Sequence, residues 1–301
     1  MKVLPGSTKS NQVLAWSPDG RFLVAGGTGD GVMAWDVNAG TPGQRILTGG
    51  HGGRLLRFCP HTGRLYVGFR NGFWIWDPHT SAEHLSAQPA PASFCMALSD
   101  DSRTVVADQY RKRKRVLVGY AVTDDGLRES WARGDSKWND AQSFVFRPGT
   151  DELFGVGAHT GDGWRFEWVR AETGEAVGSI ELSVTKHTGV RRWALAPDGE
   201  RVAWVTDYGL FLRRLDDPRT LELPAAERES RRGLAFSPDG RTLAYTSGTT
   251  VRFLDAGTFA EVRAFDWGTG KTRAVAFSPD GLRAAVSAEG GRGYVTVFDL
   301  E

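Results

Sequence analysis

Short apolar runs recur along the chain in pairs, and each pair flanks a polar turn. Residues 13–16 and 22–25, for example, are apolar on either side of the Ser-Pro-Asp-Gly sequence at 17–20. Runs this short between turn signals favour strands over helices, and two strands joined by a tight turn form a β-hairpin. Because consecutive positions in these runs are apolar, both faces of each hairpin are expected to be covered. That requirement favours small sheets packed against one another.

The turn sequence itself has a physical rationale. Proline presets φ for the second position of a type I turn, serine suits the first position and glycine the last. The sequence recurs at 17–20, 237–240 and 278–281, as Ala-Pro-Asp-Gly at 196–199, and in degraded form at 59–63, 99–102 and 147–150. We therefore expect one hairpin for each copy of the turn.

The copies are evenly spaced. Counted on the proline, or on Asp100 where proline is missing, they fall at 18, 60, 100, 148, 197, 238 and 279, which are 42, 40, 48, 49, 41 and 41 residues apart. A third strand follows each hairpin and ends at Trp35, Trp76, Tyr120, Trp168, Leu215, Leu254 or Phe298. A fourth, less apolar strand comes next, as at 44–47 and 260–263. Four strands in each of seven units predict an all-β, seven-bladed β-propeller of four-stranded antiparallel blades.

The seven units use the whole chain, 1–301, as one domain. The expected blades are approximately 11–49, 50–88, 89–133, 134–184, 185–225, 226–267, and 268–301 together with 1–6. The last unit has no fourth strand of its own. The short apolar stretch at 2–4 is expected to pair with it, which would cover an open sheet edge and join the last blade to the first.

With these repeats, the chain resembles the WD-repeat family over essentially its whole length, and specifically its bacterial members with Ser-Pro-Asp-Gly turns. The resemblance implies the propeller fold and its closure by the N-terminal strand, but it is nearly silent on function, because one fold hosts many activities. The buried His, Ser/Thr, Asp and Trp network of the family is incomplete here. Blade two has His51 without the hydroxyl, and blade five has His187, Thr206 and Asp207 without the Trp. We interpret both histidines as structural remnants.

Composition and charge exclude several classes of protein. Apolar residues make up 40% of the chain and charged residues 24%, and the formal net charge is +1, so no global field attracts nucleic acid or a membrane. We expect no secretory signal, and no stretch of the sequence approaches the roughly 20 apolar residues of a membrane span. We expect a cytoplasmic protein that is a monomer by itself. Cys59 and Cys95 lie in innermost strands and are expected to be buried, reduced and inert.

Catalytic and metal-binding patterns are missing from the sequence. The six histidines show no HExxH spacing, and there is no GxSxG elbow and no GxxxxGK[ST] loop. The recurring Asp19 and Asp239 resemble carboxylate pairs, but the turn requires them and successive blades hold them far apart. We therefore predict no catalytic residue, no metal site and no cofactor. A propeller hydrolase is the least supported hypothesis.

Arginine gathers where the innermost strands begin, at the narrow end of the propeller that we name the top face. Six residues before each turn anchor, the chain has in order Gln12, Arg54, Phe94, Gln142, Arg191, Arg232 and Arg273. Arg192 and Arg231 adjoin two of these positions. Guanidinium groups around a propeller mouth suit carboxylate or phosphate groups of a partner. The alternative is that each arginine pairs with an aspartate of a neighbouring turn.

Two further segments are expected on the same face. The sequence Arg-Lys-Arg-Lys-Arg at 111–115 lies between the second and third strands of blade three. It is either a nucleic-acid or nuclear-import patch or, as we favour, a solvated hairpin tip. Segment 129–141 lengthens the connection from blade three to blade four and carries Trp131 and Trp138. Tryptophan beside arginine is typical of interface hot spots, although either ring, and Trp131 in particular, could instead fold back onto the blades.

The sequence thus predicts a non-catalytic WD-repeat scaffold that binds a protein or peptide partner on its top face. The candidate partner-binding residues are Arg54, Phe94, Arg111, Arg113, Arg115, Trp138, Arg191, Arg232 and Arg273. The alternative is binding of an anion or nucleic acid through the arginine-lined mouth, although we do not expect nucleic acid to be the partner. No membrane partner is expected.

Overall fold

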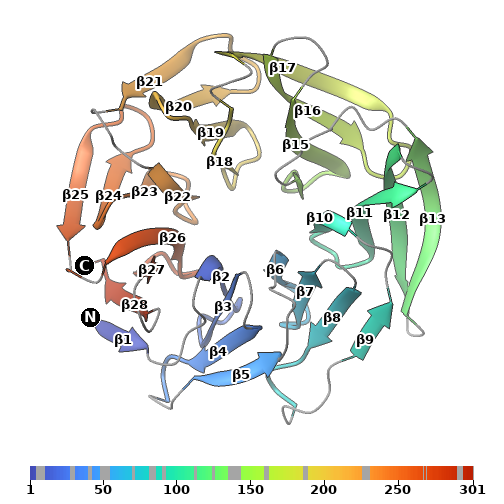
Figure 1. Cartoon of the computed structure of the whole chain (residues 1–301), viewed down its shortest axis with the longest axis horizontal. Helices are drawn as coiled ribbons and strands as arrows, with labels where there is room; N and C mark the ends of the chain where they lie inside the picture. The colour runs from blue at the N-terminus through green and yellow to red at the C-terminus, as the bar shows by residue number, and fades with distance from the viewer. Residues whose placement is uncertain are drawn as a thin grey trace. The chain divides into compact units, whose positions relative to one another are not determined.

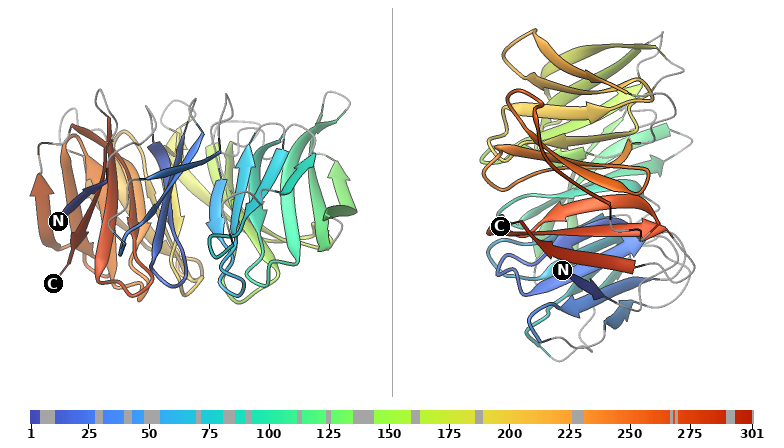
Figure 2. Two further views of the ribbon diagram at one scale, coloured as in Figure 1. Left: turned by 90° about the horizontal axis from the view of Figure 1, so that it is seen from below. Right: turned by 90° about the vertical axis from the view of Figure 1, so that its left-hand side faces the viewer.

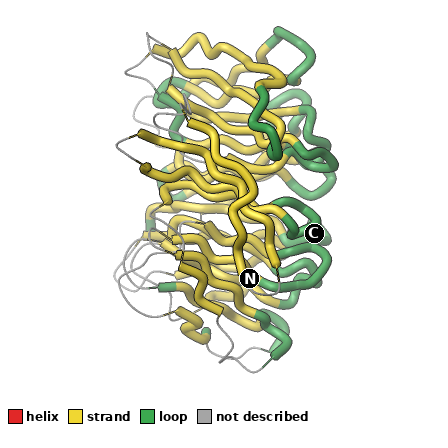
Figure 3. The backbone as a smooth tube through the Cα atoms, turned by 90° about the vertical axis from the view of Figure 1, so that its right-hand side faces the viewer, coloured by secondary structure: helices red, strands yellow, loops and turns green. Residues whose placement is uncertain are grey.

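Every regular element of the described chain is a β-strand, as the computed structural model shows (Figure 3). The described residues are all except 5–10, 28–30, 40–42, 48–54, 70–71, 81–85, 90–92, 112–113, 124–125, 135–143, 159–162, 186–188, 226–230, 267, 269, 290–293 and 301. The chain divides into two compact units. Unit 1 comprises Met1–Phe58 and Val190–Glu301, and unit 2 comprises Cys59–Gly189.

The strands form seven four-stranded antiparallel sheets, which are the blades of a seven-bladed β-propeller (Figure 1). Six sheets use four consecutive strands in chain order, and the seventh has the order β1-β28-β27-β26. The all-β propeller that the repeats predict is therefore confirmed. The prediction that 1–301 is a single domain stays a prediction.

Unit 1 holds the strands of blades one, five, six and seven and the first strand of blade two. Their bounds are β1 (Lys2–Leu4), β2 (Asn11–Trp16), β3 (Phe22–Gly27), β4 (Val32–Asp36), β5 (Gln44–Leu47), β6 (Leu55–Phe58), β18 (Arg192–Leu195), β19 (Arg201–Val205), β20 (Gly209–Arg214), β21 (Thr220–Pro224), β22 (Arg231–Phe236), β23 (Thr242–Ser247), β24 (Thr250–Asp255), β25 (Glu261–Asp266), β26 (Lys271–Phe277), β27 (Arg283–Glu289) and β28 (Tyr294–Asp299).

Unit 2 holds the remaining strands of blade two and all of blades three and four. Their bounds are β7 (Leu65–Phe69), β8 (Gly72–Trp76), β9 (Ser86–Pro89), β10 (Ser93–Leu98), β11 (Thr104–Arg111), β12 (Lys114–Thr123), β13 (Gly126–Gly134), β14 (Phe144–Phe146), β15 (Glu152–Ala158), β16 (Gly163–Arg170) and β17 (Ala176–Thr185).

The repeated turn has the same geometry in each well-preserved copy. In blade one, the amide of Gly20 donates to the carbonyl of Ser17 at 2.9 Å, and Gly20 has a φ of 67°, which an L side chain rarely adopts. The Ser17 hydroxyl accepts from the amide of Phe22 at 2.8 Å and donates to Oδ1 of Asp19 at 2.5 Å. Oδ1 of Asp19 also accepts from the amide of Arg21. The recurring aspartate is therefore a structural part of the turn.

The N-terminal strand pairs with the last strand of blade seven, in unit 1 (Figure 2). Lys2 lies opposite Val297 in this antiparallel register, and Lys2 Nζ donates to the carbonyl of Val37 in blade one at 2.7 Å. Leu4 is only 2% exposed and belongs to an apolar cluster with Trp35 of blade one and Val295 of blade seven. Strand β1 thus contacts both blades through hydrogen bonds and burial.

The core of each unit lies between neighbouring blades. In unit 1, one cluster joins Leu212 of blade five to Leu243 of blade six, and another joins Phe253 of blade six to Phe298 of blade seven. In unit 2, a cluster joins Leu117 of blade three to Phe144 of blade four. Both faces of a blade are therefore buried, as the two-sided apolar runs predict.

Cys59 is completely buried and carries a free thiol, which agrees with the burial predicted for it. Its sulfur accepts a hydrogen bond from the amide of Thr62 at 3.2 Å, so the thiol takes part in the turn of blade two. The side chain of Cys95 lies outside the described residues.

Candidate partner-binding surface

The arginine positions of unit 1 coincide with irregularities in the innermost strands. The pairing of β22 with β23 shifts between Arg231 and Leu234, and the pairing of β26 with β27 shifts between Thr272 and Ala274. Arg232 and Arg273 therefore lie within β-bulges. Bulges re-aim side chains and are common beside functional sites. This placement supports a role for both arginines beyond sheet pairing.

Buried hydroxyl groups satisfy the backbone at these bulges. The amide of Gly233 donates to Oγ1 of Thr246 at 2.7 Å, and the amide of Ala274 donates to Oγ of Ser287 at 3.1 Å. Both hydroxyl-bearing residues are fully buried. Because a buried amide without an acceptor is costly, the second-strand hydroxyl permits the bulge that positions the arginine.

Arg191 and Arg273 already form ion pairs within their own blades. Nε and Nη2 of Arg191 donate to Oδ1 and Oδ2 of Asp207 at 3.0 and 2.7 Å, and this hydrogen bonding lowers the pKa of Asp207. Asp207 lies in the turn between β19 and β20. Arg273 pairs with Glu289 at the end of β27. The sequence pattern left open that the arginines pair with acidic residues of the protein itself, and Arg191 and Arg273 do so. Their acidic partners come from the same blade, not from a neighbouring turn.

Arg231 is a structural residue. Its side chain is buried, Nη1 and Nη2 donate to the carbonyls of Leu223 and Pro224 at 2.9 and 3.1 Å, and the guanidinium carbon lies 5.0 Å from the centre of the Tyr245 ring. These contacts join the first strand of blade six to the last strand of blade five. Arg231 is thus unavailable to a partner.

Arg192 carries a charge that no carboxylate of the described chain neutralises. The residue is solvent-exposed, and its hydrogen bond runs from Nη1 to the carbonyl of Arg191 at 3.3 Å. Partial desolvation and the positive charge of Arg232 lower the pKa of Arg192. We name Arg192 and Arg232 the arginine pair. An anionic group bound beside them would relieve their mutual repulsion.

In unit 2, Arg111 belongs to a polar network of blade three. Nη1 and Nη2 of Arg111 donate to the two carboxylate oxygens of Glu129 at 3.0 and 2.7 Å, and Nε donates to Oε1 of Gln109 at 3.0 Å. Gln109 is fully buried, and its side-chain Nε2 donates to the hydroxyl of Tyr120. Hydrogen bonding to Glu129 raises the pKa of Arg111. These contacts give Arg111 a structural role.

Arg111, in the basic segment 111–115, pairs with Lys114 where β11 meets β12. Lys114 is exposed there. Arg54, Arg113 and Trp138, and the side chains of Phe94 and Arg115, lie outside the described residues, as do His51 and His187. Their predicted roles stay predictions.

Trp131 folds back onto the blades. It is half-buried and packs against the apolar cluster that contains Leu117 and Phe144. A Cβ placed on Gly119 would lie 2.1 Å from the indole nitrogen of Trp131, so a glycine is required where the ring crosses β12. Trp131 is therefore a core residue of unit 2.

Within the described residues, no three His, Cys, Asp or Glu side chains gather closely enough to hold a metal ion. A search of the same residues for a helix long and apolar enough to cross a membrane finds none. The aspartates of the repeated turns accept hydrogen bonds from backbone amides. Hydrogen bonds from the serine hydroxyl of the turn and from these amides lower the pKa values of Asp239 and Asp280.

Comparison with known proteins agrees with the repeat pattern. The family profile of the WD domain, G-beta repeat, matches residues 1–36. An uncharacterized WD repeat-containing protein of Synechocystis sp. is 30% identical over 99 residues, which are 32% of this chain and 28% of that relative. The chain therefore matches less than a third of the relative's length.

Two solved structures share the fold over almost all of their length. The Cps50 (Swd1) beta-propeller domain of Myceliophteria thermophila has a TM-score of 0.75 at 13% identity, covering 100% of this chain and 99% of that one. Hydrazine synthase of Kuenenia stuttgartiensis has a TM-score of 0.77 at 14% identity, covering 98% and 96%. At these identities the likeness shows the fold alone. The chain is therefore a seven-bladed β-propeller whose residues 1–36 match the profile of the WD domain.

Proposed function

We propose that this protein is a non-catalytic, cytoplasmic scaffold that binds a protein or peptide partner at its top face. The arginine pair carries the proposal. Arg192 is exposed beside Arg232, and no carboxylate of the described chain pairs with Arg192. Like charges held close together at the starts of β18 and β22 are unfavourable in the free protein, so a partner that presents a carboxylate to Arg192 gains from binding there.

The neighbouring arginines define the extent of this surface. Arg191 and Arg273 are held by Asp207 and Glu289, so their guanidinium groups are fixed in place. Fixed arginines lose little side-chain entropy on binding and are frequent anchors at protein interfaces. We include Arg191 and Arg273 in the proposed surface as positioned contacts around the arginine pair. Phe94, Arg113, Arg115 and Trp138 remain candidate contacts in unit 2.

The test is charge reversal of the arginine pair. A partner is captured from cells of the source organism with the wild-type protein and identified, and its affinity is then measured with purified proteins. Arg192→Glu combined with Arg232→Glu should weaken binding at least about thirtyfold, because a hot-spot arginine contributes roughly 2 kcal/mol. The melting temperature should stay within about 1 °C of the wild type.

Arg219→Glu is the matched control. Arg219 is also exposed in unit 1, on the connection between β20 and β21, and pairs with Asp217 at 2.6 Å. Its reversal should leave the affinity unchanged. A loss of binding free energy from Arg219→Glu that is about half the loss from the arginine-pair variant, in proportion to the charge removed, would mean that binding follows net charge only. A collapse of stability in the arginine-pair variant would show that these residues are structural.

The alternative function, binding of an anion or nucleic acid, is favoured by the same observation, because phosphate also suits paired guanidinium groups. Its test is fluorescence anisotropy with a labelled single-stranded oligonucleotide, together with retention on heparin. An affinity that falls steeply with salt and disappears with Arg192→Glu and Arg232→Glu would favour this alternative. Salt-insensitive binding to the captured protein, without oligonucleotide binding, would favour the scaffold.

A further inference from the structure

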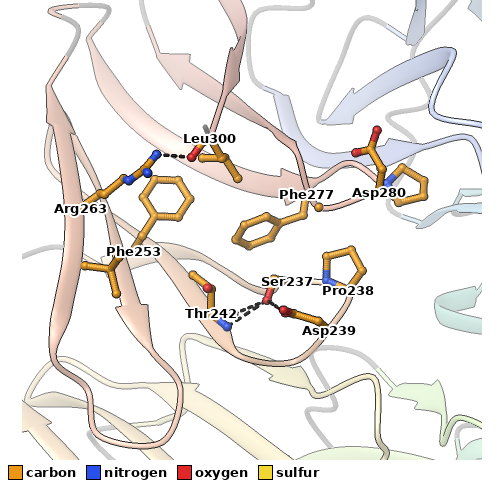
Figure 4. A pocket seen from close by; sticks show the side chains of 12 residues that line it. Ser237, Pro238, Asp239, Thr242, Phe253, Arg263, Phe277, Asp280 and Leu300 are labelled. Carbon is orange, nitrogen blue, oxygen red and sulfur yellow. Dashed lines mark hydrogen bonds between the residues drawn. The ribbon is translucent and has the colours of Figure 1, made fainter.

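A cavity of about 580 Å³ opens between blades six and seven, both in unit 1, at the end of the strands that carries the repeated turns (Figure 4). Its size falls in the range of about 300–1,000 Å³ that is typical of ligand sites. Phe253 and Phe277 form an aromatic floor with their ring centres 5.8 Å apart. Asp239 borders one end, and Arg263, which donates to the carbonyl of Leu300, borders the other.

At the junction between blades five and six, an arginine side chain fills the space that corresponds to this cavity. Arg201, the first residue of β19, donates through Nε to Oδ2 of Asp198 at 2.8 Å and through Nη2 to the carbonyl of Gly240 at 2.9 Å. Its guanidinium carbon lies 5.9 Å from the centre of the Phe236 ring. An arginine of one blade thus joins the turn aspartate of that blade to the turn glycine of the next.

The junction between blades seven and one repeats the carbonyl and ring contacts of this arrangement. Arg283, the first residue of β27, donates through Nη2 to the carbonyl of Gly20 at 3.0 Å and lies 5.1 Å from the centre of the Trp16 ring. Phe236 and Trp16 occupy the same place, because each directly precedes the first residue of its turn. Both junctions therefore hold a guanidinium group between an aromatic ring and a glycine carbonyl.

At the junction between blades six and seven the arginine is replaced by Thr242, the first residue of β23. The backbone is nevertheless arranged in the same way. A Cβ placed on Gly240, Gly20 or Gly281 would lie 3.6, 3.8 or 3.7 Å from Cδ of the proline in the preceding blade. The cavity is therefore due to the missing side chain and not to a wider separation of the two blades.

The groups that would hold a guanidinium are present at this junction and are unused. Oδ1 of Asp239 accepts from the Ser237 hydroxyl and the Arg241 amide, but Oδ2, the equivalent of the oxygen that binds Arg201, has no hydrogen-bond partner among the described residues. The carbonyl of Gly281 likewise has none in the described chain. Phe277 takes the place of Phe236 and Trp16.

We infer that this cavity binds an arginine side chain of a peptide partner. The guanidinium group bridges Oδ2 of Asp239 and the carbonyl of Gly281 and lies over the ring of Phe277, as Arg201 does at the junction between blades five and six. Arg283 makes the same carbonyl and ring contacts at the junction between blades seven and one. The cavity continues over Phe253 to Leu300, so an aliphatic residue next to the arginine covers the remaining apolar floor. This site is separate from the proposed top-face surface, because it lies at the opposite end of the strands.

The test uses the full-length protein and the peptide acetyl-Ala-Leu-Arg-Leu-Ala-amide, with binding followed by amide chemical shifts in nuclear magnetic resonance. Saturable shifts should centre on Asp239, Thr242, Phe277 and Gly281. The same peptide with citrulline in place of arginine has nearly the same shape without the charge, and it should bind at least about tenfold more weakly. Equal affinity for the two peptides, or no saturable shift at millimolar concentration, would overturn the inference.

Variants locate the binding to this junction. Thr242→Arg places a guanidinium of the protein itself in the cavity, and Asp239→Asn removes the carboxylate charge. Each substitution should lower the affinity for the arginine peptide at least about tenfold. Asp198→Asn is the matched control for Asp239→Asn, because Asp198 already holds Arg201, and it should leave the affinity unchanged. Thr220→Arg is the control for the added charge. Undiminished binding by Thr242→Arg would contradict the inference, whether or not the top-face proposal holds.

Discussion

The two sides of blade six differ in whether an arginine fills the junction with the neighbouring blade. On the side facing blade five, Arg201 fills the space between Asp198 and Gly240, whereas on the side facing blade seven, Thr242 leaves a cavity between Asp239 and Gly281. The consequence is visible at the glycines, because Gly240 is buried and Gly281 is partly exposed. The same set of acceptors, a turn aspartate and the glycine carbonyl of the next blade, can therefore stabilise the contact between blades or remain open for a ligand.

This difference shows how a repeat protein acquires a site without changing its fold. Neighbouring blades contact each other through equivalent positions, so one substitution removes one contact and leaves its acceptors in place. Proteins often give up stability where they bind. Phe253 of the cavity floor also packs against Phe265 and Phe298, and the three ring centres lie 5.9 to 6.0 Å apart.

The largest loss of stability is expected at the junction between blades seven and one, which strand β1 stabilises in addition to Arg283. Leu4→Ala should lower the free energy of unfolding by about 3 kcal/mol, because Leu4 is buried between blades seven and one and its truncation leaves a cavity. Chemical denaturation measures the change. Val3→Ala, at an exposed position of the same strand, is the control. A loss from Leu4→Ala no greater than that from Val3→Ala would show that β1 contributes little.

The closed and open sides of blade six can be compared directly. Arg201→Ala should destabilise the protein by about 2 kcal/mol, because it removes charge-assisted hydrogen bonds and leaves the carbonyl of Gly240 without its donor. Thr242→Ala should change stability by no more than about 0.5 kcal/mol, since Thr242 makes no equivalent contact. Thermal unfolding of both variants provides the measurement. Similar losses at the two positions would remove the distinction between the junctions.

The opposite substitution should close the open side. Thr242→Arg is expected to raise the free energy of unfolding by about 1 kcal/mol, which is the net gain of a partly exposed charged hydrogen-bond pair. The gain should vanish when Asp239→Asn is added, because the carboxylate is its partner. If the free energy of unfolding is still raised after Asp239→Asn is added, the arginine acts through general packing and not through the carboxylate of Asp239.

The smallest effect is a dependence on pH. Burial raises the pKa of Asp198, but hydrogen bonds from the Glu200 amide and Arg201 outweigh it and hold the value below 3.8. A depressed carboxyl pKa stabilises the fold above the unfolded value and loses that contribution as pH falls through the folded value. Stability should therefore fall below about pH 4, and less steeply in Arg201→Ala. An unchanged slope in that variant would contradict the role of the ion pair.

Binding at the open side should follow the same carboxylate chemistry. The Ser237 hydroxyl and the Arg241 amide lower the pKa of Asp239, so its carboxylate is charged at neutral pH. The affinity for the arginine peptide should be constant between about pH 5 and 8 and should fall in more acidic solution. A loss of affinity that begins near pH 6.5 would indicate a histidine instead of Asp239.

Much of the fold could be predicted from the sequence, because the repeated turn is a local structure. A Ser-Pro-Asp-Gly turn satisfies its own backbone groups, and the two-sided apolar runs require blades packed on both faces. The partners of the arginines could not be predicted in the same way. Asp207 and Glu289 meet Arg191 and Arg273 through strand register, which the sequence pattern leaves open.

One sequence difference marks the position of the cavity, but its meaning is apparent only from the structure. When the turn copies are aligned, Thr242 stands where blades five and seven have Arg201 and Arg283. Taken alone, that difference is an ordinary surface substitution. Its meaning depends on the glycine of the next blade, which is far away in the chain and is brought into contact only by the packing of the blades.

A crystal structure of the Thr242→Arg variant tests most directly whether the open junction is an empty arginine site. The introduced guanidinium should bridge Oδ2 of Asp239 and the carbonyl of Gly281, at distances close to the 2.8 and 2.9 Å that Arg201 makes to Asp198 and Gly240. It should also lie over the ring of Phe277. A guanidinium group that points into solvent, with the cavity still open beneath it, would contradict this interpretation.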